Sequence, residues 1–169
     1  MKNIFKNKIK AILIIFLAVF ITLTMNAQHE NDKPIRLAVV GMSHSHIAFI
    51  LKRPDKGDFN LVGFYDANET LTAELSNRYN LDSKLIYKDL EKMLNEVKPQ
   101  AVVAFGSIYN HLAVVEACAP RGIHVMVEKP LAVNMEHANR MKDLAEKHNI
   151  YLLTNYETSW WITRIKWCQ

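Results

Sequence analysis

Polar side chains that are capable of chemistry follow four short apolar runs of this 169-residue sequence. They lie at Gly41 to His46, at Asp66, from Gly106 to His111, and at Glu128-Lys129-Pro130. A lysine at the carboxyl end of a buried strand is suited to proton transfer, because burial favours its neutral form. The proline that follows fixes the backbone and so directs the side chain. We therefore take Lys129 as the candidate catalytic residue, with an ordinary loop lysine as the alternative.

The turn from Gly41 to His46 lies between an apolar run, Leu37 to Val40, and a stretch that is compatible with a helix. A strand, a tight turn and a helix start place backbone N–H groups where they face a phosphate. Such turns usually carry glycine where Ser43 and His46 stand here. The candidate cofactor contacts in this turn are Gly41, Ser43, His44 and His46.

Asp66 ends a second apolar run and lies 20 residues after His46. In dinucleotide-binding folds, an acid at about this distance accepts hydrogen bonds from the adenosine ribose hydroxyls. Its charge would also repel a 2′-phosphate, which favours NAD over NADP. The alternative is a turn residue that caps the next helix.

The spacing His44-x-His46 also occurs in some metal-dependent hydrolases, where both imidazoles bind the ion. Such an enzyme needs further ligands after later strands, for which His111 and Asp66 are candidates. It also needs a barrel of about 250 residues, and this chain is shorter. We keep the hydrolase as an alternative function and assign no metal ligand.

Apolar runs alternate with amphipathic stretches between short loops. Strands are expected at 35–40, 59–65, 85–87, 100–105, 123–127 and 150–154, and helices at 44–52, 68–79, 90–97, 110–119 and 135–147. This alternation predicts an α/β fold, a Rossmann-like, doubly wound parallel sheet of about six strands in a three-layer α/β/α arrangement. The domain is expected to span residues 34–157, with ligands bound at the carboxyl ends of its strands.

Residues 1–27 have the layout of a secretory signal peptide, with four lysines, an apolar run and a small residue, Ala27, before the expected cleavage site. We expect export to the periplasm and no stable membrane association after cleavage. The alternative is an uncleaved anchor, although a spanning helix needs about 20 apolar residues. Without the four lysines, 17 basic residues balance 17 acidic residues, so the charge gives no evidence for a nucleic-acid partner. The two cysteines indicate no disulfide framework, and Cys118 is expected in the core.

The stretch AVVAFGSIYNHLAVVEACAPRGIHVMVEKPLA, from Ala101 to Ala132, is the most specific pattern in the chain. Together with Leu37 to Gly41 and Asp66, it resembles the N-terminal domain of the Gfo/Idh/MocA oxidoreductases. The resemblance implies NAD(P)-dependent oxidoreduction of a sugar or polyol. It also implies that Lys129 lies near the nicotinamide, that Glu128 lies beside the nicotinamide ribose, and that Gly106 to His111 passes the middle of the cofactor.

Family members continue into a second domain of roughly 200 residues, whereas residues 158–169 form a short tail with three tryptophans. From the resemblance we expect a truncated or frame-shifted product that binds nucleotide with little or no activity alone. The alternatives are a non-catalytic nucleotide-binding fragment and a natural short protein. A homo-oligomer is compatible with each of these possibilities.

Overall fold

The computed structural model describes Ile15, residues 33–54 and residues 56–156. The chain divides into two compact units, Met1–Pro34 and Ile35–Gln169, and the second unit contains the sheet and its helices. The expected aromatic tail, and the expected signal peptide apart from Ile15, lie outside the described residues. Within the described part of the chain, no helix has the length and apolar character needed to cross a membrane.

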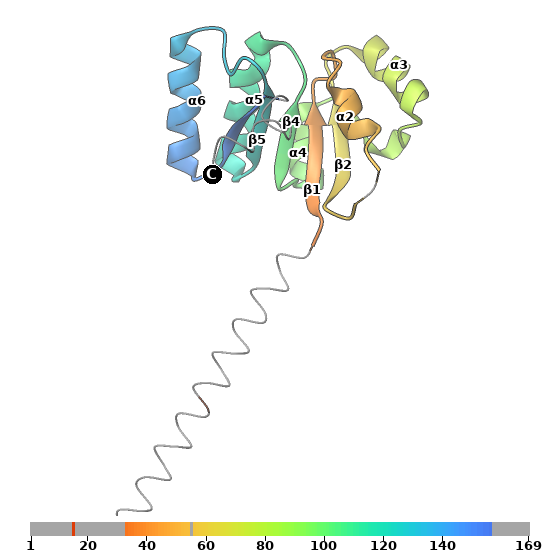
Figure 1. The fold of residues 1–169 in the computed structure, drawn as a ribbon, viewed down its shortest axis with the longest axis horizontal. Helices are drawn as coiled ribbons and strands as arrows, with labels where there is room; N and C mark the ends of the chain where they lie inside the picture. The colour runs from red at the N-terminus through yellow and green to blue at the C-terminus, as the bar shows by residue number, and fades with distance from the viewer. Residues whose placement is uncertain (1–14, 16–32, 55, 157–169) are drawn as a thin grey trace, which may run out of the picture. The chain divides into compact units, whose positions relative to one another are not determined.

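Six parallel strands form one open sheet (Figure 1). In chain order they are β1 (Ile35–Val40), β2 (Phe59–Tyr65), β3 (Ile86–Tyr87), β4 (Ala101–Ala104), β5 (His124–Glu128) and β6 (Leu152–Asn155). The spatial order is β3-β2-β1-β4-β5-β6, so the order reverses between β1 and β4. In doubly wound folds this reversal creates the crevice in which ligands bind. The predicted Rossmann-like sheet is confirmed.

Five α-helices join these strands: α2 (Ile47–Leu51), α3 (Glu69–Tyr79), α4 (Leu90–Val97), α5 (His111–Cys118) and α6 (Met135–His148). Three single-turn 3₁₀ helices lie at Ser83–Leu85, Ile108–Asn110 and Ala119–Arg121. Side chains cap the longer helices as the sequence suggests. Asp89 accepts a hydrogen bond from the Lys92 N–H at 2.6 Å, and Asn134 accepts one from the His137 N–H at 2.8 Å.

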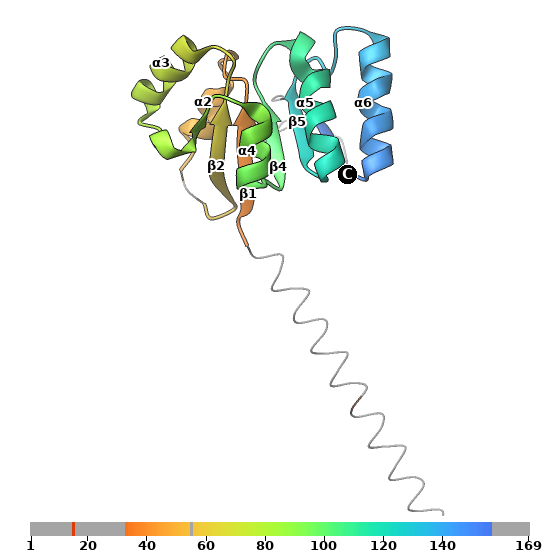
Figure 2. The same cartoon turned by 180° about the vertical axis from the view of Figure 1, so that it is seen from behind.

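Successive residues of each strand point to opposite faces of the sheet. Because apolar side chains therefore lie on both faces, helices cover both. In β1, Ala38 and Val40 belong to a core with residues of α4, α5 and α6, whereas Leu37 and Val39 belong to a core with residues of α2 and α3. Figure 1 shows α2 in front of the sheet, and Figure 2 shows α4 and α5 in front of the opposite face. Cys118 is fully buried in the first core, and burial raises the pKa of its thiol to about 12.

The expected helix at 44–52 is shorter in the structure. Helix α2 begins at Ile47, and a turn precedes it in which the Ile47 N–H donates to the His44 carbonyl. Its N-cap, His46, makes no side-chain capping bond. The residues expected at the start of the helix therefore present their side chains at the end of the sheet.

Candidate functional site

The turn after β1 is built around a close approach of two glycines. Gly41 has a φ of 74°, and its N–H donates to the Tyr65 carbonyl at 2.7 Å. A Cβ atom at Gly41 would lie 2.5 Å from the Gly106 Cα atom and 2.6 Å from the Gly106 nitrogen. Glycine at this position therefore permits both the left-handed backbone and the contact between the β1 and β4 turns.

Asp66 ties the end of β2 to the same turn. Its Oδ2 atom accepts a hydrogen bond from the Met42 N–H at 2.6 Å, and its Oδ1 atom accepts one from the Asn68 N–H at 2.7 Å. An ionised carboxylate has about four acceptor positions, so Asp66 can also accept bonds from a ligand hydroxyl. Helix α3 is capped by the Asn68 side chain, which accepts from the Leu71 N–H.

A cavity of about 400 Å³ lies where the strand order reverses. This volume falls within the range of about 300–1,000 Å³ that is usual for ligand pockets. Five of the sequence-predicted site residues line it: Gly41, Ser43, Asp66, Gly106 and His111. The crevice expected from the strand order is therefore present, and the residues from three separate predicted groups meet in it.

The Phe105 carbonyl fixes the middle of the turn that follows β1. Its carbonyl accepts a hydrogen bond from the His44 N–H at 2.8 Å, and the exposed Ser43 hydroxyl lies 3.5 Å from the same oxygen. The amides of Met42 and His44 are thus engaged within the protein. A phosphate at this turn would depend on its other donors, among them the Ser43 hydroxyl.

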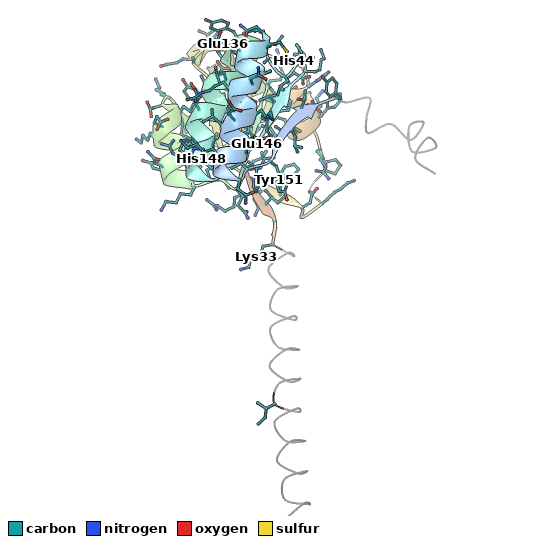
Figure 3. All side chains as sticks on the ribbon, turned by 90° about the vertical axis from the view of Figure 1, so that its left-hand side faces the viewer. Lys33, His44, Glu136, Glu146, His148 and Tyr151 are labelled. Carbon is teal, nitrogen blue, oxygen red and sulfur yellow. The ribbon has the colours of Figure 1, made fainter. Side chains whose placement is uncertain are left out.

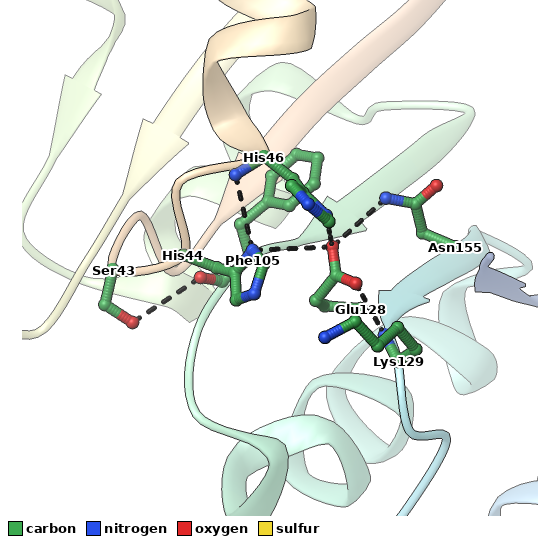
Figure 4. A network of polar contacts seen from close by, with 7 residues as sticks. All are labelled: Ser43, His44, His46, Phe105, Glu128, Lys129 and Asn155. Carbon is green, nitrogen blue, oxygen red and sulfur yellow. Dashed lines mark hydrogen bonds and ion pairs between the residues drawn. The ribbon is translucent and has the colours of Figure 1, made fainter. Parts of the chain in front are cut away.

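A second group of predicted residues gathers around the carboxylate of Glu128, at the end of β5 (Figure 4). Glu128 is 1% exposed. Its Oε2 atom lies 2.8 Å from His46 Nδ1 and 3.7 Å from His44 Nδ1. The Asn155 amide donates to Oε2 at 3.1 Å, and the Lys129 N–H donates to Oε1 at 2.8 Å.

These contacts determine the charge of Glu128. Burial raises its pKa, but the hydrogen bonds from the Lys129 N–H, His46 and Asn155 outweigh that effect and hold the pKa below its ordinary value. Glu128 is therefore a buried carboxylate anion at neutral pH. A buried anion is tolerated only where several hydrogen-bond partners surround it, and the His46 ring, the Lys129 N–H and the Asn155 amide surround this one.

His111 is buried at the start of α5 and lines the cavity. Its Nδ1 atom lies 3.1 Å from the Leu131 carbonyl oxygen and is the donor of that bond, so Nε2 is the acceptor nitrogen. Burial lowers the pKa of His111, which keeps the imidazole neutral. Among the described residues, Nε2 has no hydrogen-bond partner. His111 thus anchors the segment that follows Lys129.

Lys129 itself is exposed, and it lies beside Glu128 (Figure 4). The expectation that the Lys129 side chain would be buried at the end of the strand is therefore wrong for this structure. The fold does place Lys129 at the carboxyl end of the sheet. Lys129 follows β5 directly, and the peptide bond to Pro130 is cis.

The structure divides the predicted residues into two sets. Gly41, Ser43, Asp66, Gly106 and His111 line the cavity, whereas His44, His46, Glu128 and Lys129 lie together at the end of β5. The sequence reading missed Asn155, which closes the second set from the end of β6. Asn155 follows the last apolar run, so the rule that placed the other candidates after strands would have found it.

The cavity set fits the adenosine end of a dinucleotide. Asp66 keeps acceptor capacity for ribose hydroxyls, and Gly41 allows the turns after β1 and β4 to meet at the cavity without a side chain between them. The strand order is the one found in dinucleotide-binding folds. Fold and cavity therefore define the class of the protein, a Rossmann-type dinucleotide-binding domain.

Comparison with known proteins identifies the family. The model of the Gfo/Idh/MocA family, described as an oxidoreductase family with an NAD-binding Rossmann fold, matches residues 35–156. The chain belongs to this family. The resemblance seen in the sequence is thereby confirmed.

Two curated relatives are enzymes with polyhydroxylated substrates in their names. The chain is 25% identical over 122 residues to the myo-inositol 2-dehydrogenase of Thermotoga maritima, covering 72% of this chain and 36% of that protein. It is 30% identical over 121 residues to the D-glucoside 3-dehydrogenase of Escherichia coli, covering 69% and 33%. The chain thus spans about a third of the length of these relatives.

A solved structure shows the same fold with a cofactor bound. The inositol dehydrogenase homolog from Azotobacter vinelandii, complexed with NAD+, superposes with a TM-score of 0.61 and 27% identity. The match covers 73% of this chain and 34% of that one.

Proposed function

We propose that this chain binds NAD at the carboxyl ends of β1, β2 and β4, as the cofactor-binding part of an oxidoreductase that acts on a sugar or polyol. The observation that carries the proposal is the position of Asp66. Its carboxylate contacts the turn after β1 and lines the cavity beside Gly41 and Gly106. The names of the relatives support a cyclic, polyhydroxylated substrate.

The residues of the chain have separate roles in this proposal. Asp66 accepts hydrogen bonds from the adenosine ribose, and the Ser43 hydroxyl donates to a phosphate oxygen. Glu128 lies beside the nicotinamide ribose, and Lys129 exchanges a proton with the reacting hydroxyl or carbonyl group. When bound, NAD supplies the carbon that accepts the hydride.

Calorimetric titration of NAD and NADP into the 169-residue chain tests cofactor binding. We expect tighter binding of NAD, because the Asp66 carboxylate repels a 2′-phosphate. Loss of a hydrogen bond to a charged group removes about 1.5–3 kcal/mol, so Asp66→Asn should weaken NAD binding about 10- to 100-fold and narrow the preference over NADP. Asp82→Asn is the control, because Asp82 is an exposed aspartate that also accepts a backbone hydrogen bond. A wild-type chain that binds neither nucleotide would refute the proposal.

The role of Lys129 needs a separate measurement. Lys129→Ala should leave NAD binding intact and remove any hydride transfer from inositols or glucosides, followed by the absorbance of NADH. Lys147→Ala, an exposed change near the end of α6, should affect neither. Where the wild type shows measurable turnover, an equal rate for Lys129→Ala would exclude Lys129 as the proton-transfer residue without affecting the binding proposal.

For the chain alone we propose nucleotide binding with little or no turnover, because the chain matches only about a third of the length of the relatives that carry the whole activity. We also propose export to the periplasm, on the basis of residues 1–27. The hydrolase alternative is not supported, because the described strands form an open sheet and not a barrel.

A further inference from the structure

Two histidines and a buried glutamate meet at the end of β5, although they come from opposite ends of the domain sequence. His44, His46 and Glu128 each offer one ligand atom, and these atoms all lie within 4.8 Å of one another. The imidazole rings of His44 and His46 meet edge to face, with centroids 4.4 Å apart. Figure 4 shows both rings on the same side of the Glu128 carboxylate.

The distances from Glu128 to the two histidines are close to the ligand separations of a metal site. Ligands about 2.0–2.2 Å from a tetrahedral Zn²⁺ lie about 3.3–3.5 Å from each other. Glu128 Oε2 lies 2.8 Å from one imidazole nitrogen and 3.7 Å from the other, which brackets this value. The two imidazole ligand atoms lie within 4.8 Å of each other, so binding one ion also requires the two rings to move closer together.

The surroundings hold the carboxylate ready to bind. The Lys129 N–H occupies Oε1, so Oε2 is directed towards the histidines, and the Asn155 amide fixes its orientation. Hydrogen bonds of this kind to a ligating carboxylate raise metal affinity by orienting it. His44 is 32% exposed, which leaves a route from solvent to an otherwise covered site.

The ligand set also selects the kind of ion. Imidazole suits zinc, iron, nickel and copper, whereas magnesium and calcium prefer oxygen ligands alone. Three protein ligands leave at least one position open for water or another oxygen. In the present structure, His44 Nδ1 accepts a long hydrogen bond of 3.3 Å from the His46 N–H, and His46 Nδ1 lies 2.8 Å from Glu128 Oε2. An ion at this site would replace both of these contacts.

We propose that His44, His46 and Glu128 bind one divalent transition-metal ion, of which Zn²⁺ is the probe. The site lies beside Lys129, with its open position available to an oxygen ligand. The proposal goes beyond the NAD-binding function and does not depend on it, because neither histidine lines the cavity at the strand reversal.

The test is equilibrium dialysis of the 169-residue chain, purified without a histidine tag and without nucleotide, against limiting Zn²⁺. Metal content is measured by mass spectrometry, and affinity by competition with a chromophoric chelator. We expect one ion per chain and a visible absorption spectrum typical of tetrahedral coordination when Co²⁺ replaces Zn²⁺. Asn155→Ala, which removes only an orienting bond, should weaken binding about 10- to 100-fold.

His44→Ala and Glu128→Gln should each abolish stoichiometric binding and the tetrahedral Co²⁺ spectrum. His148→Gln is the control, because His148 lies at the opposite end of the domain from His44 (Figure 3). Thermal melts show whether each variant is folded. If the change at the buried Glu128 disrupts the fold, the partly exposed variant His44→Ala still tests the proposal. The absence of a bound ion in the wild type, or unchanged Zn²⁺ affinity in folded His44→Ala or Glu128→Gln, would overturn the proposal.

Discussion

Replacing Gly41 by alanine tests how the turn at the strand reversal is built. The left-handed backbone, with φ of 74°, costs a non-glycine residue about 1–2 kcal/mol. The new Cβ would lie 2.5 Å from the Gly106 Cα atom, and because this neighbour is backbone, it cannot turn aside. Overpacking of this kind costs about 1–3 kcal/mol, and the stiffer unfolded chain of the variant offsets about 0.4–1 kcal/mol. We expect Gly41→Ala to lower the free energy of unfolding by about 2–4 kcal/mol.

Two matched variants separate the backbone penalty from the collision. Gly122 has a similar φ of 69°, but an added Cβ would meet no atom within 4 Å. Gly122→Ala should therefore cost only about 1 kcal/mol. Gly106→Ala places its Cβ 3.3 Å from the Gly41 Cα atom and should fall between the two.

Urea unfolding followed by far-ultraviolet circular dichroism measures all three variants, with equal slopes expected because they expose the same surface. Calorimetry should also show weaker NAD binding for Gly41→Ala and unchanged binding for Gly122→Ala. If Gly41→Ala and Gly122→Ala lose the same stability, the close approach of the two turns does not constrain residue 41, and the reasoning fails.

Three further results are expected. Asn134→Ala, which removes the cap of α6, should cost about 1 kcal/mol in urea unfolding, whereas the exposed mid-helix change Asn139→Ala should cost nothing measurable. Burial lowers the pKa of His111 below its ordinary value of 6.5, so on acidification the unfolded chain takes up a proton there before the folded chain does. The contribution of the neutral His111 to the free energy of unfolding is therefore fully present above pH 6.5 and is lost as the pH falls below it. The urea midpoint should then fall more steeply from pH 7.5 to pH 5.5 in the wild type than in His111→Gln, and equal slopes would contradict this. When the chain is expressed in a Gram-negative host, we expect to recover from the periplasm a protein whose mass matches a chain that begins at Gln28. Recovery of the uncleaved chain in the membrane fraction would favour an uncleaved membrane anchor.

The sequence predicted the elements well where an apolar run ends at a residue with a strong local preference. The strands at 35–40 and 59–65 and the helix at 90–97 have the expected bounds, because turns, caps and prolines delimit them. Local patterns also placed Asp66 and Gly106 at strand ends. They could not show that both would meet Gly41 in one cavity, since that depends on the order of strands in space.

The cluster around Glu128 was harder to foresee. Strand β4 lies between β1 and β5, so contact between His46 and Glu128 depends on how far each side chain reaches across the end of the sheet. The sequence pattern placed the histidines at the start of a helix, where they would line up with the phosphate turn. Because α2 begins only at Ile47, His44 and His46 lie in a turn and reach Glu128 instead.

Ser43 and His46, which stand where such turns usually carry glycine, therefore change the hydrogen bonds that fix the turn. They also change which ligands the turn can bind. Asp66 accepts from the Met42 N–H on one side, the Phe105 carbonyl accepts from the His44 N–H in the middle, and Glu128 bonds the His46 ring on the other side. A turn fixed by these bonds is preorganised, but two of its amides are no longer available to an anion. In the binding mode proposed above, contacts from Asp66 to a ribose and from Ser43 to a phosphate supply more of the nucleotide affinity than in a glycine-rich turn. The same bonds gather two imidazoles beside a buried carboxylate, an arrangement that glycine at position 46 would not allow.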